Sequence, residues 1–156
     1  MTAPLVVRAL ALGLAAGSRS TLGVAAPLLG PAPAHRLPTH GLRRPAGVLR
    51  LVAGLAVAGE LVGDKLPTAP SRLDPPGPDV RAGSGAAGGL LLAVRHHATA
   101  ASTVAAGLAG AVGGAVGTGA GAAWRASVAR RGWPDLPAAL AEDVVALTLA
   151  AWATRA

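Results

Sequence analysis

Residues 98–124 read ATAASTVAAGLAGAVGGAVGTGAGAAW, a run of 27 residues without a charged side chain. A helix of about 20 apolar residues is long enough to cross the hydrocarbon core of a bilayer. Gly113, Gly117 and Gly121 recur at every fourth position, and a row of small residues lets a second helix approach closely. The run therefore predicts a membrane-spanning helix that packs tightly against a neighbour.

The rest of the chain shares this apolar, glycine-rich character. Of its 156 residues, 52% are hydrophobic, 22 are glycine and 13% are charged. The charged fraction is about half of the roughly 25% that is usual in soluble domains. We expect residues 1–156 to form a single all-α integral membrane domain, a polytopic helical bundle with glycine- and alanine-rich packing.

The net charge of +7 does not indicate a nucleic-acid partner. The arginines cluster in short segments between apolar runs, which is where basic residues of membrane proteins are found. The chain has no Phe or Tyr to interleave with a basic face and stack on bases. It also has no Cys, which excludes disulfides and thiolate chemistry.

Four apolar segments are expected to cross the membrane: residues 5–29, 45–66, 98–124 and 138–153. A fifth, residues 82–94, is too short to cross alone, so we expect a short or re-entrant helix there, or the start of a longer one. The first segment also resembles a secretory signal. Its apolar character resumes after Arg19, however, which favours a transmembrane helix with one internal arginine.

Arg19 and Ser20 lie near the middle of the first expected span, in Gly17-Ser18-Arg19-Ser20. A guanidinium in hydrocarbon is costly unless it pairs or reaches water. The small neighbours would let another helix or its carboxylate approach. Arg19 is therefore expected to form a structural ion pair or to contact a substrate or anion.

Glu60 and Asp64 lie one helical turn apart on one face of the second expected span. Gly59 and Gly63 flank that face and are expected to allow close helix packing. Two carboxylates this close repel each other unless a cation or proton is shared. Together with Arg19 and Ser20, the intramembrane polar site is expected to comprise Glu60, Asp64, Lys65 and Arg72. It is either a buried ion-pair network or a cation or proton site.

Glu142 and Asp143 open the last expected span and are secondary candidates together with Arg125. Acidic residues in a first helical turn complement the helix dipole, and these two could also face Arg125. His96 and His97 are adjacent and point in different directions, so they predict no metal site. No cofactor is expected.

Three features together resemble a known family: Gly17-Ser18-Arg19-Ser20, the block from Glu60 through Asp64-Lys65-Leu66-Pro67 to Arg72, and the Glu142-Asp143 pair. The chain is similar over its whole length to the bacterial, actinobacterial-type membrane proteins grouped as domain of unknown function 4126. The resemblance implies a multi-pass location in the bacterial inner membrane. It implies no activity, substrate or catalytic residue.

Two functions fit these observations. The first is a small transporter or channel-like bundle that handles a small ion or proton. The second is a structural or partner-binding membrane protein whose buried charges only stabilise it. We found no nucleophile–base pair or multi-Asp metal motif, so we do not expect an enzyme. The expected partners are membrane lipid and other copies of the chain. A structural role predicts that Arg19 and Glu60 are directly paired and closed off from water, whereas a transporter predicts that at least one of them faces a polar cavity that reaches a surface. We expect Arg19 to lie within ion-pair reach of Glu60 or Asp64.

Overall fold

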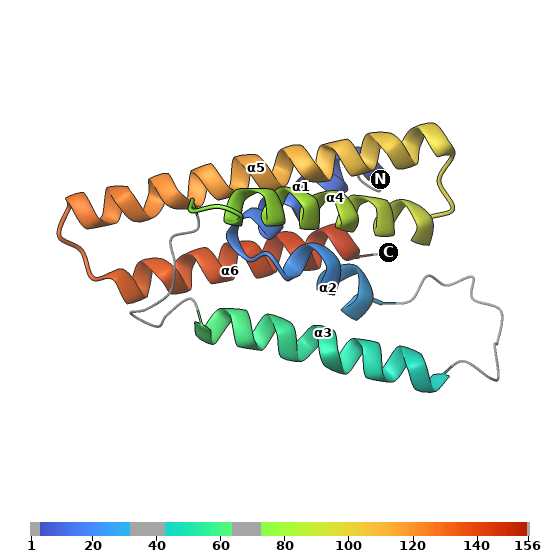
Figure 1. The fold of residues 1–156 in the computed structure, drawn as a ribbon, viewed down its shortest axis with the longest axis horizontal. Helices are drawn as coiled ribbons and strands as arrows, with labels where there is room; N and C mark the ends of the chain where they lie inside the picture. The colour runs from blue at the N-terminus through green and yellow to red at the C-terminus, as the bar shows by residue number, and fades with distance from the viewer. Residues whose placement is uncertain (1–3, 32–42, 64–72, 156) are drawn as a thin grey trace.

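The computed structural model describes residues 4–31, 43–63 and 73–155, with backbone alone at 43–46. In these ranges the chain is helical and contains no strand (Figure 1), which confirms the all-α class. The helices are α1 (Leu5–Ser18), α2 (Leu22–Leu29), α3 (Arg43–Gly63), α4 (Gly77–Arg95), α5 (Ala100–Arg130) and α6 (Asp135–Thr154).

The chain reverses direction between α1 and α2, which form a helical hairpin (Figure 1). Gly13 of α1 lies against Gly110 of α5. One turn later Gly17 lies against Gly117, so α1 and α5 run parallel. Figure 1 shows α2 running the opposite way, alongside α4. The prediction that residues 5–29 form one membrane-spanning helix is therefore wrong.

The reversal has a local cause in the polar residues that follow α1. Arg19 has an extended backbone, with φ −136° and ψ 102°, and this ends the helix. Ser18, Ser20 and Thr21 flank it, and short hydroxyl side chains compete with the helix for backbone hydrogen bonds. A buried guanidinium with five donors also needs hydrogen-bond partners. The chain turns at Arg19, where Asp143 accepts a hydrogen bond from the guanidinium.

The other expected segments fall within helices with shifted bounds. Residues 45–66 begin within α3 and run past its described end, residues 98–124 correspond to most of α5, and residues 138–153 lie in α6. Residues 82–94 lie inside α4, which has 19 residues. The short, folded-back element is therefore the α1–α2 hairpin.

Helices α1, α4 and α5 touch backbone to backbone. A Cβ added to Gly110 would lie 2.0 Å from the carbonyl oxygen of Gly85. A Cβ on Gly117 would lie 2.4 Å from the carbonyl oxygen of Leu14. Gly113 packs on α1 in the same way, and Gly121 is buried. The predicted packing role of Gly113 and Gly117 is thus confirmed, because at these positions no side chain fits.

Helix α3 packs in a different way. Among the described residues, nothing lies within 4 Å of a Cβ built on Gly59 or Gly63, so the predicted close helix packing at these glycines is not found there. Among the side chains described on α3, Ala53 is buried, whereas Leu51 and Leu55 are each 63% exposed. The small residues of this helix therefore do not form a tight interface with the described part of the chain.

The bundle has small residues inside and large apolar residues outside. Most of the buried hydrophobic residues are alanines, and the large apolar residues that are exposed include Val104, Leu108, Val112 and Val116 on α5. Soluble proteins bury Val and Leu preferentially. By length and apolar composition, two of the described helices, α5 and α6, qualify to cross a membrane.

Candidate functional site at the hairpin tip

Residues 19–21, which we call the hairpin tip, bind polar side chains of three helices. Asp143 of α6 binds Arg19, Glu60 of α3 binds Ser20 and Thr21, and Ser84 of α4 binds Ser20. Each of these groups comes from a part of the sequence distant from the tip. The hairpin thus places an irregular backbone segment where three other helices can satisfy it.

Arg19 is buried and ion-paired. Its side chain is 1% exposed, its Nε donates to Asp143 Oδ1 at 2.7 Å, and its Nη2 lies 2.5 Å from the same oxygen. Its Nη1 donates to the carbonyl oxygen of Ser18 at 2.9 Å. Removing one partner of such a buried pair leaves an uncompensated charge, which is strongly destabilising. Arg19 and Asp143 therefore act as a unit.

Glu60 binds four donors of the hairpin tip. Its Oε1 accepts from the backbone N–H and the hydroxyl of Ser20, both at 2.7 Å. Its Oε2 accepts from the N–H of Thr21 at 2.8 Å and from its hydroxyl at 2.6 Å. Because Thr21 directly precedes α2, this carboxylate also lies at the positive end of that helix dipole. Glu60 thus serves as the cap of α2.

Arg19 is expected to pair with Glu60 or Asp64; among the described residues no ion pair joins it to Glu60, and the Asp64 alternative stays a prediction. Within the described chain, Glu60 bonds to Ser20 and Thr21, while Arg19 pairs with Asp143. The expected partners Asp64, Lys65 and Arg72 lie outside the described residues. The two described carboxylates that bind the tip come from different helices, Glu60 from α3 and Asp143 from α6.

Hydroxyl groups satisfy the backbone that the hairpin frees. Ser84 Oγ donates to the carbonyl oxygen of Ser20. Thr118 Oγ1 donates to the carbonyl oxygen of Gly114 at 2.8 Å and to that of Gly17 at 3.4 Å. Buried backbone groups outside a helix require such partners. The sequence analysis missed Ser84 and Thr118. The sequence feature that could have identified them is a hydroxyl residue within a glycine-rich helix.

Arginines cap the opposite end of α2. Arg50 of α3 donates from Nε and Nη2 to the carbonyl oxygens of residues 28–30, at 3.0 to 3.2 Å. Arg95 at the end of α4 donates to the carbonyl oxygens of Pro27 and Pro31. Cations are favoured at helix C-termini because unsatisfied carbonyl groups point there. The sequence analysis did not single out these two arginines.

Arg8 has the same role at the end of α6. Its Nε donates to the carbonyl oxygen of Ala153 at 2.8 Å, and its Nη2 donates to that of Arg155. In the turn after α4, burial and then the positive charge of Arg8 lower the pKa of His96 below its usual range.

Among the described residues, no group of three or more His, Asp or Glu side chains could hold a metal ion.

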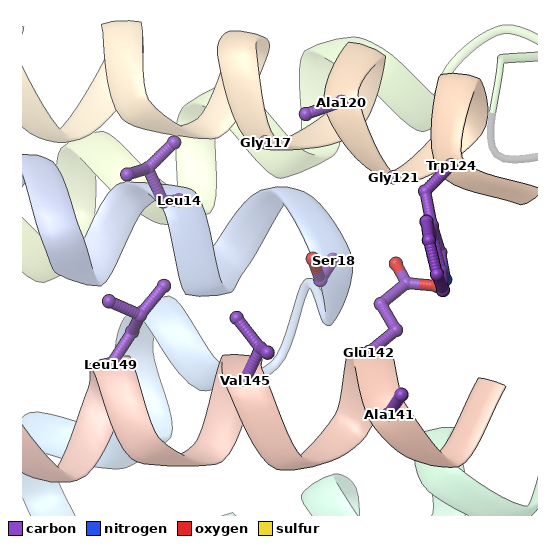
Figure 2. A pocket seen from close by; sticks show the side chains of 10 residues that line it. All are labelled: Leu14, Ser18, Gly117, Ala120, Gly121, Trp124, Ala141, Glu142, Val145 and Leu149. Atoms are coloured by element: carbon purple, nitrogen blue, oxygen red, sulfur yellow. The ribbon is translucent and has the colours of Figure 1, made fainter. Parts of the chain in front are cut away.

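Arg125 and Glu142 lie apart from the hairpin tip. Arg125 donates from Nε to Asp135 Oδ1 at 2.8 Å, and its Nη1 is 3.8 Å from Glu142 Oε2. Asp135 was not predicted as a partner. Glu142 and Asp143 are adjacent in sequence but serve different places, since Asp143 binds Arg19 and Glu142 lines a crevice (Figure 2). The two adjacent carboxylates therefore lie in different parts of the structure.

The hairpin tip brings two carboxylates, one guanidinium and two hydroxyls into contact. No family model, curated protein or solved structure matches this chain. The resemblance to domain of unknown function 4126 therefore stays a prediction, and the arrangement of the tip is what bears on function.

Proposed function

We propose that the protein is a multi-pass protein of the cell membrane in which α3 to α6 cross and the α1–α2 hairpin enters and leaves on one side. These four helices have 21, 19, 31 and 20 residues, so each is about 28 Å long or more at roughly 1.5 Å per residue. That matches a hydrocarbon core of about 30 Å. Helix α1 has 14 residues and reaches only about 21 Å.

The placement of large apolar residues supports the membrane location. Val and Leu side chains cover the outside of the described helices, while Gly and Ala fill the contacts between them. Lipid tails are as apolar as Leu, so membrane helices associate through small residues and close backbone contact. In water, the same surface would be an apolar patch far larger than soluble proteins display.

Within the membrane, we propose that the protein is a small transporter of ions or protons and that the hairpin tip is its gate. The observation that carries this proposal is that the Glu60 carboxylate, on the loosely packed α3, binds four donors of the tip. If α3 moved away, the carboxylate and these donors would be uncovered together. Irregular backbone at membrane depth occurs either buried in protein or beside a water-filled cavity, and the tip would alternate between these two states.

The experiment is flux of protons and monovalent ions into proteoliposomes. We expect flux above that of empty liposomes, and a fall of about tenfold in Glu60→Gln, because the neutral amide removes the negative charge that would hold the passing cation or proton when the tip is uncovered. The matched control is Asp79→Asn, which removes an exposed carboxylate on α4 and should leave flux unchanged. We expect Glu142→Gln to change flux less than Glu60→Gln.

A second function is favoured by the burial of Arg19. Its 1% exposure and its pairing with Asp143 fit a structural protein whose charges only hold the hairpin in place. On this alternative, every variant that folds gives no flux above empty liposomes. Glu60→Gln would then lower thermal stability without any transport phenotype, and that result would contradict the transporter proposal.

A further inference from the structure

Charged residues are distributed unevenly between the two ends of the bundle. All seven Asp and Glu residues fall in residues 60–79 and 135–143. The described parts of these segments belong to the end of α3, the approach to α4 and the first half of α6, toward the left-hand side of Figure 1. The opposite end is formed by the beginnings of α1, α3 and α5 and the ends of α2, α4 and α6. We call it the basic end, and its titratable side chains that the structure describes are those of Arg8, Arg50, Arg95, His96, His97 and Arg155.

The positive charge of the basic end is not balanced by a described carboxylate. Arg8 caps α6, and Arg50 and Arg95 cap α2, in each case by donating to backbone carbonyl oxygens. A carbonyl oxygen satisfies a donor of the guanidinium but does not neutralise its charge. Three helices begin and three end here, so the helix dipoles largely cancel. At the other end of the bundle, by contrast, Arg125 bonds to the Asp135 carboxylate at 2.8 Å.

The groups of the basic end are close enough to repel one another. Burial, and then the positive charges of Arg8, Arg95 and His97, lower the pKa of His96. The side chains of His96, His97 and Arg155 are exposed. An anion bound at this surface would be attracted by several positive charges at once and would relieve the repulsion among them.

Exposed apolar side chains adjoin the basic end. Val94, which directly precedes Arg95, is 67% exposed, and Trp152, three residues before Arg155, is 39% exposed. Tryptophan is enriched at the level of the lipid headgroups because its ring is apolar and its N–H is polar. Arginines beside such side chains can reach lipid phosphates while the apolar groups contact the acyl chains.

We propose that the basic end is a binding surface for anionic phospholipids. Clustered arginines at a membrane surface attract lipids whose headgroups carry a net negative charge. Zwitterionic lipids such as phosphatidylcholine carry the same phosphate but no net charge, so the surface favours the anionic lipid. The inference rests on the membrane location proposed above and not on transport by the hairpin tip.

The test is quenching of Trp152 fluorescence by brominated lipids. The full chain, in a Trp124→Phe/Trp133→Phe background, is reconstituted into phosphatidylcholine vesicles. A fraction of the lipid is replaced by either brominated phosphatidylglycerol or brominated phosphatidylcholine with the same acyl chains. At low salt we expect a binding constant at least about tenfold higher for the anionic lipid, since each arginine near the surface contributes a factor of about five. At 1 M salt, where the Debye length is about 3 Å, the preference should disappear.

Three variants of that background locate the surface. Arg155→Gln removes an exposed charge of the basic end and should lower the preference for the anionic lipid about fivefold. Arg155→Lys keeps the charge and should keep the preference. Arg130→Gln makes the same change in net charge as Arg155→Gln at an exposed position of α5, at the other end of the bundle, and should have no effect at Trp152.

Three results would overturn the proposal. Equal binding constants for the two brominated lipids would show that the basic end does not select lipid by charge, and would leave the membrane location intact. Absence of quenching by either lipid would contradict the membrane location as well. Equal losses of preference in Arg155→Gln and Arg130→Gln would show that the net charge of the whole chain, and not the basic end, attracts the lipid.

Discussion

The α1–α5 interface and the α2–α3 interface hold their helices by different means. Between α1 and α5, glycines bring the backbones together, so that a Cβ on Gly13 would lie 2.2 Å from the carbonyl oxygen of Gly110. Between α2 and α3 the described glycines make no such contact. There, Glu60 binds the N-terminal end of α2 and Arg50 binds its C-terminal end.

The difference between the two interfaces indicates which helix can move. Backbone contact over several turns fixes α1 against α5, because any displacement loses many van der Waals contacts at once. Glu60 and Arg50 are ten residues apart, which is about 15 Å on a helix, and they span the eight-residue α2. Besides these two polar contacts, only the packing of Ala53 and Val57 is described between α3 and the core. We therefore expect motion in α3 and rigidity in α1, α4 and α5.

The largest effect is expected from breaking the buried ion pair between Arg19, which follows the rigid helix α1, and Asp143. Asp143→Ala removes a carboxylate that pairs with the buried Arg19, which should lower the free energy of unfolding by about 3–5 kcal/mol. The double variant Arg19→Met/Asp143→Ala should recover most of that loss. The control is Asp135→Ala, whose ion pair with Arg125 is exposed and should cost about 1 kcal/mol or less. Thermal unfolding in detergent measures all three, and similar losses for Asp143→Ala and Asp135→Ala would contradict the account.

Matched glycine substitutions compare the two interfaces directly. In Gly110→Ala the new Cβ would lie 2.0 Å from the carbonyl oxygen of Gly85, so α4 and α5 must separate. We expect a loss of about 2–3 kcal/mol that outweighs the roughly 1 kcal/mol gain in helix propensity. Gly54→Ala on α3 meets nothing within 4 Å and should be neutral or slightly stabilising. If both variants lost the same stability, packing density would not distinguish the two regions.

A smaller, local effect is expected when the Glu60 contact is removed. The chain has no native cysteine, so a single introduced thiol reports local opening. Ala53→Cys places it on the buried face of α3, and Thr118→Cys, where the side chain is 2% exposed, places it in the α1–α5 interface. Adding Glu60→Ala should speed maleimide labelling of Cys at position 53 by about tenfold or more and leave position 118 unchanged. Faster labelling at both positions would mean that the whole bundle loosens.

The sequence predicted the helical class and the glycine contacts because both depend on local pattern. Gly113 and Gly117 lie on one face of a helix and allow close packing of any helix that lies against that face. The sequence did not predict that Gly59 and Gly63 lack such contacts with the described residues, since spacing does not tell which face of a helix meets the bundle. The same spacing therefore led to a confirmed prediction in α5 and, in α3, to close packing that is not found among the described residues.

The sequence did not predict the hairpin or the partner of Arg19, for a related reason. Apolar residues on both sides of Arg19 predict one continuous span, and the competing signal is the short polar run from Ser18 to Thr21. Whether such a run kinks a helix or reverses it depends on what the other helices offer. Asp143, 124 residues away, takes the guanidinium, and Glu60 takes the hydroxyl groups.

The reversal at residues 19–21 is tested most directly by the sidedness of the two ends of the hairpin. Pro4 precedes α1 and Pro31 follows α2, and both are exposed. Single-cysteine variants Pro4→Cys and Pro31→Cys are labelled with a membrane-impermeant maleimide, in intact cells and in inverted vesicles. The account predicts that both thiols react from the same side of the membrane. Reaction from opposite sides would show that residues 5–29 cross as one span and would contradict the hairpin.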